Sequence, residues 1–371
     1  MIPVFKPSMS TAEIKAVAEV LKSGWIGLGP KTKEFEEKFA DYIGTKYAIA
    51  VNSATAALHL AMKVMGVEKG EVITTPMTFV STNHAILYNN ASPVFCDIEA
   101  DTLNIDVNKI EALITKRTKA IVVVHYGGYA VDMDKVMRIS KKYGLKVIED
   151  AAHGCGGEYK SQKLGSIGDM GCFSFHAVKN LATGDGGMIT TKDKKAYERL
   201  LKLRWMGITK DTWRREERDF ERYSWYYNVE GVGFKYHMND ITASIGLVQL
   251  PKLDTMNRKR FEISRLYSKT LASFKNIQLP VIKDYMTRPA CHNYVIKLKE
   301  RDRLNEYLKE RGISTGVHYI PNNEYAMYKQ FKGRTPIAQE VWKKILTLPL
   351  FPDLKSREIK LIISSIKEFF R

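Results

Sequence analysis

The sequence predicts an α/β fold in which a mainly parallel central sheet is flanked by helices, followed by a smaller C-terminal α+β domain. From residue 47 onward, short apolar segments rich in β-branched residues alternate with helical segments. This alternation implies right-handed βαβ crossovers. The short segments are apolar throughout, as strands buried on both faces should be. With 371 residues and 44% hydrophobic content, the chain is long and apolar enough to bury a large core, and its length predicts roughly two domains.

The region before this alternation is predicted to contain two helices. Residues 10–13, Ser-Thr-Ala-Glu, form a capping-box pattern that opens the first helix, and apolar residues at helical spacing continue it to Leu21. Three glycines and a proline within residues 23–30 predict a loop. Residues 33–43 predict the second helix. We expect this region to form an N-terminal arm attached to the larger domain.

Strands and helices then follow one another regularly. The expected strands are 47–51, 72–75, 94–97, 120–125, 146–149, 172–175 and 188–191. The expected helices are 55–64, 81–88, 107–114, 133–143 and 197–205. The order of these segments predicts one central sheet with helices packed on it.

The remaining chain predicts a second unit. Residues 207–232 are polar and aromatic and predict a long loop or a short helical insertion. Asn239 and Asp240 cap a helical run that Pro251 interrupts, and a further helix is expected over 253–271. We therefore expect an N-terminal arm and large cofactor-binding domain over 1–250, and a small C-terminal domain over 251–371. The elements expected in the small domain are strands 294–298 and 315–319 and helices 303–311, 337–346 and 356–369.

The net charge of +17 favours anionic partners such as nucleic acid, anionic lipid or a phosphorylated ligand. The alternative is an ordinary solvated surface, because lysines and arginines are spread along the chain with acidic residues between them. The sequence shows no helix-turn-helix, zinc or aromatic RNA-binding signature. The net charge is therefore the only feature that supports the alternative of a non-catalytic nucleic-acid-binding protein. We expect no specific nucleic acid partner.

The four cysteines are widely spaced and include no C-x-x-C pair, so they predict neither a metal site nor a disulfide framework. Reduced, mostly buried thiols in a cytoplasmic enzyme fit this pattern best. The N-terminus lacks the basic-then-apolar pattern of a signal peptide. No apolar run reaches the ~20 residues that a membrane-spanning helix needs, and we expect no membrane partner.

Lys179 is the most informative residue of the chain. It follows the predicted strand 172–175 and precedes the glycine-rich segment 184–187, and Asp150 ends an upstream strand. A buried lysine that forms a Schiff base and an acid that keeps the pyridine nitrogen protonated are what pyridoxal 5'-phosphate (PLP) requires. Taken alone, the aspartate fits a helix N-cap and the lysine an exposed strand end. Their combination favours a PLP enzyme, because ligands collect beyond the carboxyl ends of parallel strands.

Further residues predict the surroundings of this cofactor. Ser53, Ala54 and Thr55 lie at a strand-to-helix junction, where free amides and hydroxyls suit a phosphate, although plain N-capping explains them equally. Ser174 is a second candidate phosphate donor. Phe79 follows another predicted strand and offers a flat side chain that can stack on the cofactor ring, with simple core packing as its alternative. His153 lies three residues after the acid, where a first helical turn would place both side chains on the same side, with a structural role as its alternative.

These motifs resemble the DegT/StrS family of nucleotide-sugar aminotransferases, which are PLP enzymes of the aspartate-aminotransferase fold (fold type I). The resemblance runs almost end to end. The matching segments are 23–26 (SGWI), 55–60 (TAALHL), 76–80 (PMTFV), 149–153 (EDAAH), 173–176 (FSFH), 179–180 (KN), 184–187 (GDGG), 316–321 (GVHYIP) and 348–352 (LPLFP).

The resemblance implies a role for each predicted residue. Lys179 bonds the cofactor and moves the proton between the substrate carbon and the cofactor, and Asp150 holds the pyridine nitrogen. The remaining cofactor contacts implied are His153 and Phe79 on the ring, and Ser53, Ala54, Thr55 and Ser174 on the phosphate. Family members are homodimers with shared active sites, and residues 233–238 resemble the segment that reaches the partner's phosphate. Most members carry Asn and Arg where this chain has Lys235 and His237; a lysine still meets a phosphate as a point charge.

The reaction implied is ping-pong. L-Glutamate loads the cofactor as pyridoxamine phosphate, which then aminates a keto-sugar linked to a nucleoside diphosphate. Residues 124–128 and 76–79 are closer to the branch that aminates C4 than to the C3 branch, which stays an alternative. A PLP-dependent sugar dehydratase or racemase-like enzyme on the same fold is another alternative. The candidate substrate contacts are Trp25, Ile26, Lys179, the 214–218 region, His318 and Tyr319.

Overall fold

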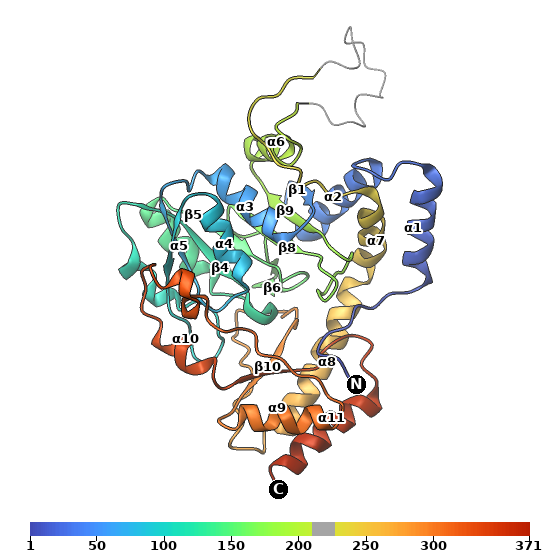
Figure 1. Cartoon of the computed structure of the whole chain (residues 1–371), viewed down its shortest axis with the longest axis vertical. Helices are drawn as coiled ribbons and strands as arrows, with labels where there is room; N and C mark the ends of the chain where they lie inside the picture. The colour runs from blue at the N-terminus through green and yellow to red at the C-terminus, as the bar shows by residue number, and fades with distance from the viewer. Residues whose placement is uncertain (210–226) are drawn as a thin grey trace.

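A seven-stranded sheet forms the centre of the molecule in the computed structural model, which describes residues 1–209 and 227–371 (Figure 1). The strand order is β1-β9-β8-β5-β4-β2-β3. The pairs from β8 to β3 are all parallel, while β9 runs antiparallel to both of its neighbours. The prediction of a mainly parallel α/β sheet is confirmed. The strands are β1 Tyr47–Val51, β2 Glu71–Thr74, β3 Ser92–Phe95, β4 Thr118–Val124, β5 Lys146–Asp150, β8 Met170–Ser174 and β9 Gly187–Thr191.

The reversed strand β9 has a simple cause. The segment between β8 and β9 contains no α-helix, and a parallel connection needs a crossover of about a dozen residues or more, usually helical. The chain therefore turns back beside β8 and pairs with it antiparallel from Met170 opposite Thr191 to Ser174 opposite Gly187. This turn contains Lys179, so the connection that reverses the strand direction also places the lysine just beyond the end of β8.

The sheet is buried on both faces, as the apolar strands predict. In β4, Ala120 and Val122 belong to the core cluster that includes helix α3, while Ile121 and Val123 belong to the cluster that includes helix α5. Adjacent strand residues point to opposite faces, so each face has its own apolar layer. The helices are α1 Thr11–Ser23, α2 Pro30–Ile43, α3 Ala54–Met65, α4 Val80–Tyr88, α5 Met133–Tyr143, α6 Lys194–Leu203, α7 Asp240–Gln249, α8 Leu253–Leu271, α9 Arg301–Glu310, α10 Pro336–Val341 and α11 Ser356–Phe369.

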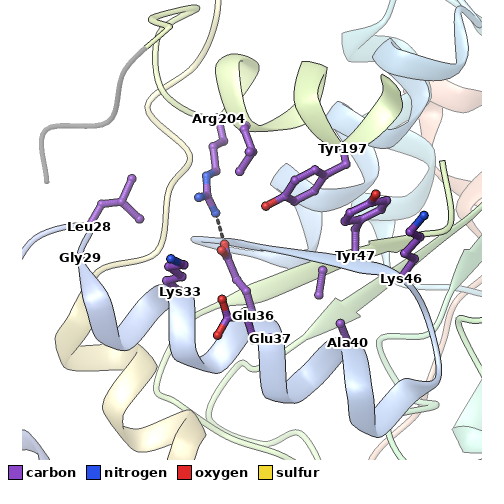
Figure 2. Close-up of a pocket in the computed structure, with 12 residues that line it drawn as sticks. Leu28, Gly29, Lys33, Glu36, Glu37, Ala40, Lys46, Tyr47, Tyr197 and Arg204 are labelled. Carbon is purple, nitrogen blue, oxygen red and sulfur yellow. Dashed lines mark hydrogen bonds and ion pairs between the residues drawn. The ribbon is translucent and has the colours of Figure 1, made fainter. Parts of the chain in front are cut away.

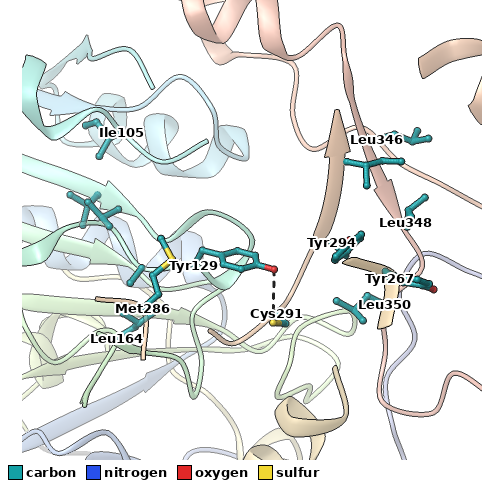
Figure 3. Packing of buried hydrophobic residues seen from close by; sticks show 14 of the residues in the cluster. Ile105, Tyr129, Leu164, Tyr267, Met286, Cys291, Tyr294, Leu346, Leu348 and Leu350 are labelled. Carbon is teal, nitrogen blue, oxygen red and sulfur yellow. Dashed lines mark hydrogen bonds between the residues drawn. The ribbon is translucent and has the colours of Figure 1, made fainter. Parts of the chain in front are cut away.

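The largest core cluster continues from the central sheet into the C-terminal region (Figure 3). Tyr129 and Leu164 on the sheet side and Tyr294 and Leu348 on the C-terminal side all belong to it. There β10 (Tyr294–Lys297) pairs antiparallel with β11 (Ile345–Leu348), and a separate small hairpin joins β6 (Glu158–Tyr159) to β7 (Gln162–Lys163). The long helix α8 runs from the body around the sheet toward α9 and α11 (Figure 1). The division at residue 250 stays a prediction.

Three predicted elements are wrong in detail. The expected helix 107–114 is two short 3-10 helices, Val107–Lys109 and Glu111–Leu113. The expected strand 315–319 is a single bridge between Gly316 and Thr347. The expected helix 337–346 ends at Val341, because the chain beyond it pairs with β10 as strand β11, and cross-strand pairing overrides the local helical pattern.

The first helix begins as predicted, since the Glu13 carboxylate accepts a hydrogen bond from the Ser10 amide at 2.8 Å. All four cysteines are buried and unpaired, in keeping with the expectation of reduced thiols. Of the helices that the structure describes, none combines the length and the apolar character needed to cross a bilayer.

Candidate active site

A cavity of about 360 Å³ lies where β5 and the β8–β9 turn meet the first turns of α3 and α4. This volume falls within the range of ~300–1,000 Å³ that is typical of small-molecule pockets. Most of the predicted site residues line it. They are Ser53, Ala54, Thr55, Phe79, Asp150, His153, Ser174, Lys179, His318 and Tyr319.

Lys179 lies on the turn between β8 and β9 and is half-buried at the cavity wall. Its amide donates to the His176 carbonyl at 2.8 Å. The next residue, Asn180, is buried and donates to Asn257 Oδ1 and to the Ala290 carbonyl, both at 2.8 Å. Burial lowers the pKa of Lys179 to about 8, although the charge of Asp150 opposes this. The amine is therefore partly unprotonated near neutral pH and able to act as a nucleophile.

Asp150 ends strand β5 and is buried, with 3% of its surface exposed. Its Oδ2 accepts from the Thr82 hydroxyl at 2.7 Å, and its Oδ1 accepts from the Ala152 amide at 3.1 Å. Among the ion pairs of the described residues, none includes this carboxylate. Burial raises the pKa of Asp150 above its usual value, although these two donors oppose the shift. The site therefore holds a buried carboxylate that a cationic ligand group would stabilise.

Thr82 and Thr78 belong to the site and were not predicted. The two hydroxyl oxygens lie 2.7 Å apart, and because Thr82 donates to Asp150, Thr78 donates to Thr82. They are four residues apart across the start of α4, a spacing that places side chains on the same helix face. The four-residue spacing of the two threonines beside Phe79 was the only feature of the sequence that could have indicated them. Nothing in the sequence connects these threonines to Asp150.

The neighbouring acid, Glu149, faces away from the cavity. It accepts from His125 Nε2 at 2.9 Å and from the amides of Gly165, Ile167 and Gly168 at 2.7–2.8 Å. Burial opposes ionisation, but these bonds hold the pKa of Glu149 below its usual value. Adjacent residues of a strand point to opposite faces, so Glu149 secures a loop while Asp150 faces the cavity.

The first turn of α3 supplies hydrogen-bond donors to the lining of the cavity. Ser53 is the N-cap of α3, where its side chain accepts from the Ala56 amide at 3.1 Å. The amides of Ala54 and Thr55 belong to the first helical turn, which has no intrahelical acceptor. Gly187 lets β9 pass close to this turn, because a Cβ on it would lie 2.5 Å from the Ser53 carbonyl carbon. The helix N-terminus and the hydroxyls suit an anion.

His153 and Phe79 also line the cavity. The imidazole Nε2 lies 3.1 Å from the Tyr319 hydroxyl, and the Gly127 amide donates to Nδ1 at 3.3 Å. Burial lowers the pKa of His153 well below its usual value. The segment after Asp150 is a turn rather than the helical turn we expected. Phe79 is 58% exposed, and its ring centroid lies 6.1 Å from that of Tyr319.

Three predicted residues lie away from this cavity within one chain. Trp25 Nε1 donates to the Leu28 carbonyl at 3.2 Å, and Ile26 is 49% exposed. The Lys235 ammonium lies 3.5 Å from the centre of the Trp205 ring. None of the three lines the cavity, and their contacts with a ligand stay predictions. The candidate substrate region 214–218 lies outside the described residues.

A second cavity, of about 120 Å³, lies between α2, β1 and α6 (Figure 2). Figure 2 shows Arg204 pointing toward Glu36, and these two side chains form a buried ion pair. Arg204 also donates to the Ala50 carbonyl at 2.9 Å, while the Ala50 amide donates to Glu36 at 2.8 Å. This arrangement ties three elements together, and we assign it a structural role.

Comparison with known proteins agrees with this geometry. The family model described as the DegT/DnrJ/EryC1/StrS aminotransferase family matches residues 7–367. The spore coat polysaccharide biosynthesis protein SpsC of Bacillus subtilis is 41% identical over 382 residues, covering 100% of this chain and 97% of the relative.

Two solved structures are similar along their whole length. The putative sugar aminotransferase Spr1654 of Streptococcus pneumoniae, in its PMP-form, has a TM-score of 0.92 and 33% identity, covering 99% of this chain and 98% of the other. PseC of Helicobacter pylori, an aminotransferase involved in the biosynthesis of pseudoaminic acid, has a TM-score of 0.92 and 31% identity, covering 100% and 99%. The fold is that of the fold type I PLP aminotransferases. The chain belongs to the DegT/DnrJ/EryC1/StrS aminotransferase family of sugar aminotransferases.

Proposed function

We propose that this protein uses PLP to transfer an amino group from L-glutamate to a keto-sugar linked to a nucleoside diphosphate, at C4 of the sugar. The observation that carries the proposal is the presence of Lys179 and Asp150 in the walls of one cavity. A nucleophilic amine and a buried carboxylate are the two groups that PLP chemistry requires of a protein.

The residues of the cavity fit the cofactor. Asp150 supplies a buried negative charge without an ion-pair partner among the described side chains, which suits a protonated pyridine nitrogen. The first turn of α3, with Ser53 and Thr55, supplies donors for the phosphate, and Ser174 also lines the cavity. Phe79 offers a flat apolar side chain beside them. When bound, the cofactor supplies an electron sink that stabilises negative charge at the substrate carbon bearing the amine.

Different residues of the cavity would move the proton, orient the ring and bind the phosphate. Lys179 would hold the cofactor, and its amine would move the proton at the substrate carbon. Asp150 keeps the proton on the ring nitrogen, and Thr82 orients the carboxylate. The donors of α3 fix the phosphate, so that the reacting atoms stay beside Lys179.

The substrate class is supported by the relatives and by charge. The relatives named above include proteins of spore coat polysaccharide and pseudoaminic acid biosynthesis, which points to amino-sugar formation for polysaccharides. The net charge of +17 attracts an anionic diphosphate. His318 and Tyr319 line the cavity and are proposed to contact the sugar. The preference for C4 over C3 rests on the resemblance of residues 124–128 and 76–79.

The proposal includes a cytoplasmic homodimer with shared sites. Trp25, Ile26 and Lys235 do not line the cavity of their own chain, and a second subunit would bring such residues to it. Two apolar side chains a few residues before Lys235 in the sequence, Val229 at 56% and Val232 at 85% exposed, suit burial in an interface. Mixing Lys179→Ala and Lys235→Ala subunits tests this. Shared sites predict that mixed dimers regain activity, whereas unshared sites predict that they do not.

The deciding assay measures 2-oxoglutarate release from L-glutamate with a panel of nucleotide-linked keto-sugars, and identifies the aminated carbon by NMR. We expect at most one equivalent of release per site without a keto-sugar, continued release only when a keto-sugar is present, and loss of release in Lys179→Ala. The exposed Lys195→Ala on α6 is the matched control and should behave as wild type. A dehydratase or racemase-like enzyme would transform its substrate without net 2-oxoglutarate, and that outcome would refute the transaminase.

A further inference from the structure

One turn after β4 holds two side chains that line the cavity from distant parts of the chain. The Tyr126 hydroxyl donates to the carbonyl of His318, the residue before Tyr319. The Gly127 amide donates to Nδ1 of His153 at 3.3 Å. Tyr126 itself is buried, with 2% of its surface exposed. The turn therefore sets the positions of Tyr319 and His153 together.

The contact with Gly127 decides where the proton of His153 lies. A backbone amide only donates, so Nδ1 must present its lone pair to it. Burial, together with the nearby charge of Lys179, lowers the pKa of His153 well below its usual value. The imidazole is therefore neutral and carries its hydrogen on Nε2.

The ring of His153 is also fixed from behind. The ring of His292 lies 4.4 Å away between centroids, and Phe5 stacks on His292 at 5.0 Å with an interplanar angle of 6°. The His292 Nδ1 lies 3.0 Å from Asn180 Oδ1. Since the Asn180 nitrogen donates to two other acceptors, His292 donates in this bond. These contacts hold His153 in the orientation that points Nε2 at Tyr319.

It follows that His153 donates to Tyr319, whose hydroxyl oxygen lies 3.1 Å from Nε2. The tyrosine keeps its own proton, because burial and the neighbouring Asp150 raise its pKa. Within residues 1–209 and 227–371, the hydroxyl of Tyr319 makes no other hydrogen bond that would use this proton. Tyr319 lines the cavity, so an acceptor there is the partner left for the proton.

We propose that His153 and Tyr319 form a directed pair, in which the histidine donates to the tyrosine and the tyrosine presents its proton to an oxygen acceptor of the ligand in the cavity. This inference rests on the proposed function. Two kinds of oxygen have the required chemistry: the phenolic oxygen attached to the pyridine ring of the cofactor, and a carbonyl or hydroxyl oxygen of the sugar. The pair positions whichever oxygen it meets relative to Lys179.

Tyr319→Phe separates the two sources. If the acceptor is the cofactor oxygen, the visible spectrum of the holoenzyme and its dependence on pH change before any substrate is added. If the acceptor is the sugar, that spectrum stays unchanged and KM for the keto-sugar rises ~3–10-fold, which corresponds to one net hydrogen bond. Tyr129→Phe is the matched control, because it removes a buried tyrosine hydroxyl outside the cavity. It should leave the spectrum and KM as in wild type.

The cofactor-free protein supplies an independent readout. Nitrogen NMR of its histidines should show His153 neutral with hydrogen on Nε2. His153→Gln places an amide donor near Nε2 and should retain more of the Tyr319-dependent effect than His153→Asn, which offers none there. A charged His153 or the Nδ1–H form at neutral pH would overturn the pair, as would a Tyr319→Phe holoenzyme with wild-type spectrum, KM and kcat. A wild-type protein that never takes up PLP would instead refute the proposed function.

Discussion

The Thr82 hydroxyl donates to Oδ2 of Asp150 over 2.7 Å, joining the first turn of α4 to the end of β5. Both residues are buried. A neutral donor lowers the cost of burying the carboxylate without cancelling its charge. The charge therefore stays available to a cationic group in the cavity, and several consequences are measurable.

Thr82→Val keeps the shape of the side chain and removes the hydroxyl donor. We expect the free energy of unfolding of the cofactor-free protein to fall by ~1–3 kcal/mol, because a buried acceptor loses its partner. Urea denaturation measures this. Thr255→Val, at an exposed position of α8, is the control and should be within experimental error of wild type. Equal stability of the two variants would show that the hydrogen bond contributes little.

Asp150→Asn should act in opposite directions on stability and on cofactor binding. The folded-state pKa of Asp150 is raised, so the folded protein holds this proton more tightly than the unfolded chain does. Stability from this group is lost as pH rises through the unfolded and then the folded pKa. In the absence of cofactor, the Tm of the Asn variant should therefore exceed that of wild type, and this difference should be larger at pH 7 than at pH 4.

The same variant should bind PLP more weakly. Loss of a charged partner for the ring nitrogen removes an interaction worth ~1.5–3 kcal/mol, or about 10–100-fold in the dissociation constant. Titration of the visible absorbance measures the constant. An Asn variant with wild-type affinity and turnover would remove Asp150 from the role assigned to it.

Cofactor uptake should depend on pH through Lys179. Because its pKa is lowered to about 8, the reactive neutral amine becomes roughly tenfold scarcer for each pH unit below that value. The association rate of PLP with the cofactor-free protein, followed by stopped-flow absorbance, should rise with pH and level off above about 8. A midpoint near 10.5, the ordinary lysine value, would show that the amine is not desolvated as described.

Gly187→Ala should disturb the first turn of α3. The added Cβ would lie 2.5 Å from the carbonyl carbon of Ser53 and 2.8 Å from the nitrogen of Ala54. Both are backbone atoms, so the chain must shift at a cost of ~1–3 kcal/mol, and PLP affinity should fall with stability. Gly231→Ala is the control, because an added Cβ there meets no atom within 4 Å. Wild-type melting and cofactor affinity in Gly187→Ala would contradict the close approach.

Arg204→Met tests the structural role of the second cavity. It removes the buried guanidinium that bonds Glu36 and the Ala50 carbonyl, and breaking a buried ion pair typically costs ~3–5 kcal/mol. The folded fraction should still show the visible absorbance of bound PLP, because this cavity contains no active-site residue. The exposed Arg199→Met on α6 should cost little. Loss of cofactor binding without loss of stability would argue against a purely structural role.

Much of the site could be predicted because its residues follow local rules. Ser53, Asp150 and Lys179 all occur where a strand ends, and in a mainly parallel sheet such positions meet at one edge. The apolar strands and the order of elements predicted that sheet without any knowledge of contacts. The predictions that failed concern single short elements whose local pattern is weak. The chain after Val341, for example, pairs as a strand, although its own pattern favoured a helix.

The amino-acid order by itself determined the positions of a candidate amine, a candidate acid and candidate phosphate donors, because each of them follows a strand end of a βαβ pattern. Only the tertiary structure decided which hydroxyl meets Asp150, which way Glu149 faces, and that the Tyr319 hydroxyl lies within hydrogen-bond distance of His153. Thr82 is 68 residues from Asp150, and Tyr319 is 166 residues from His153. Contacts across such separations depend on how whole elements pack, and no local pattern encodes them.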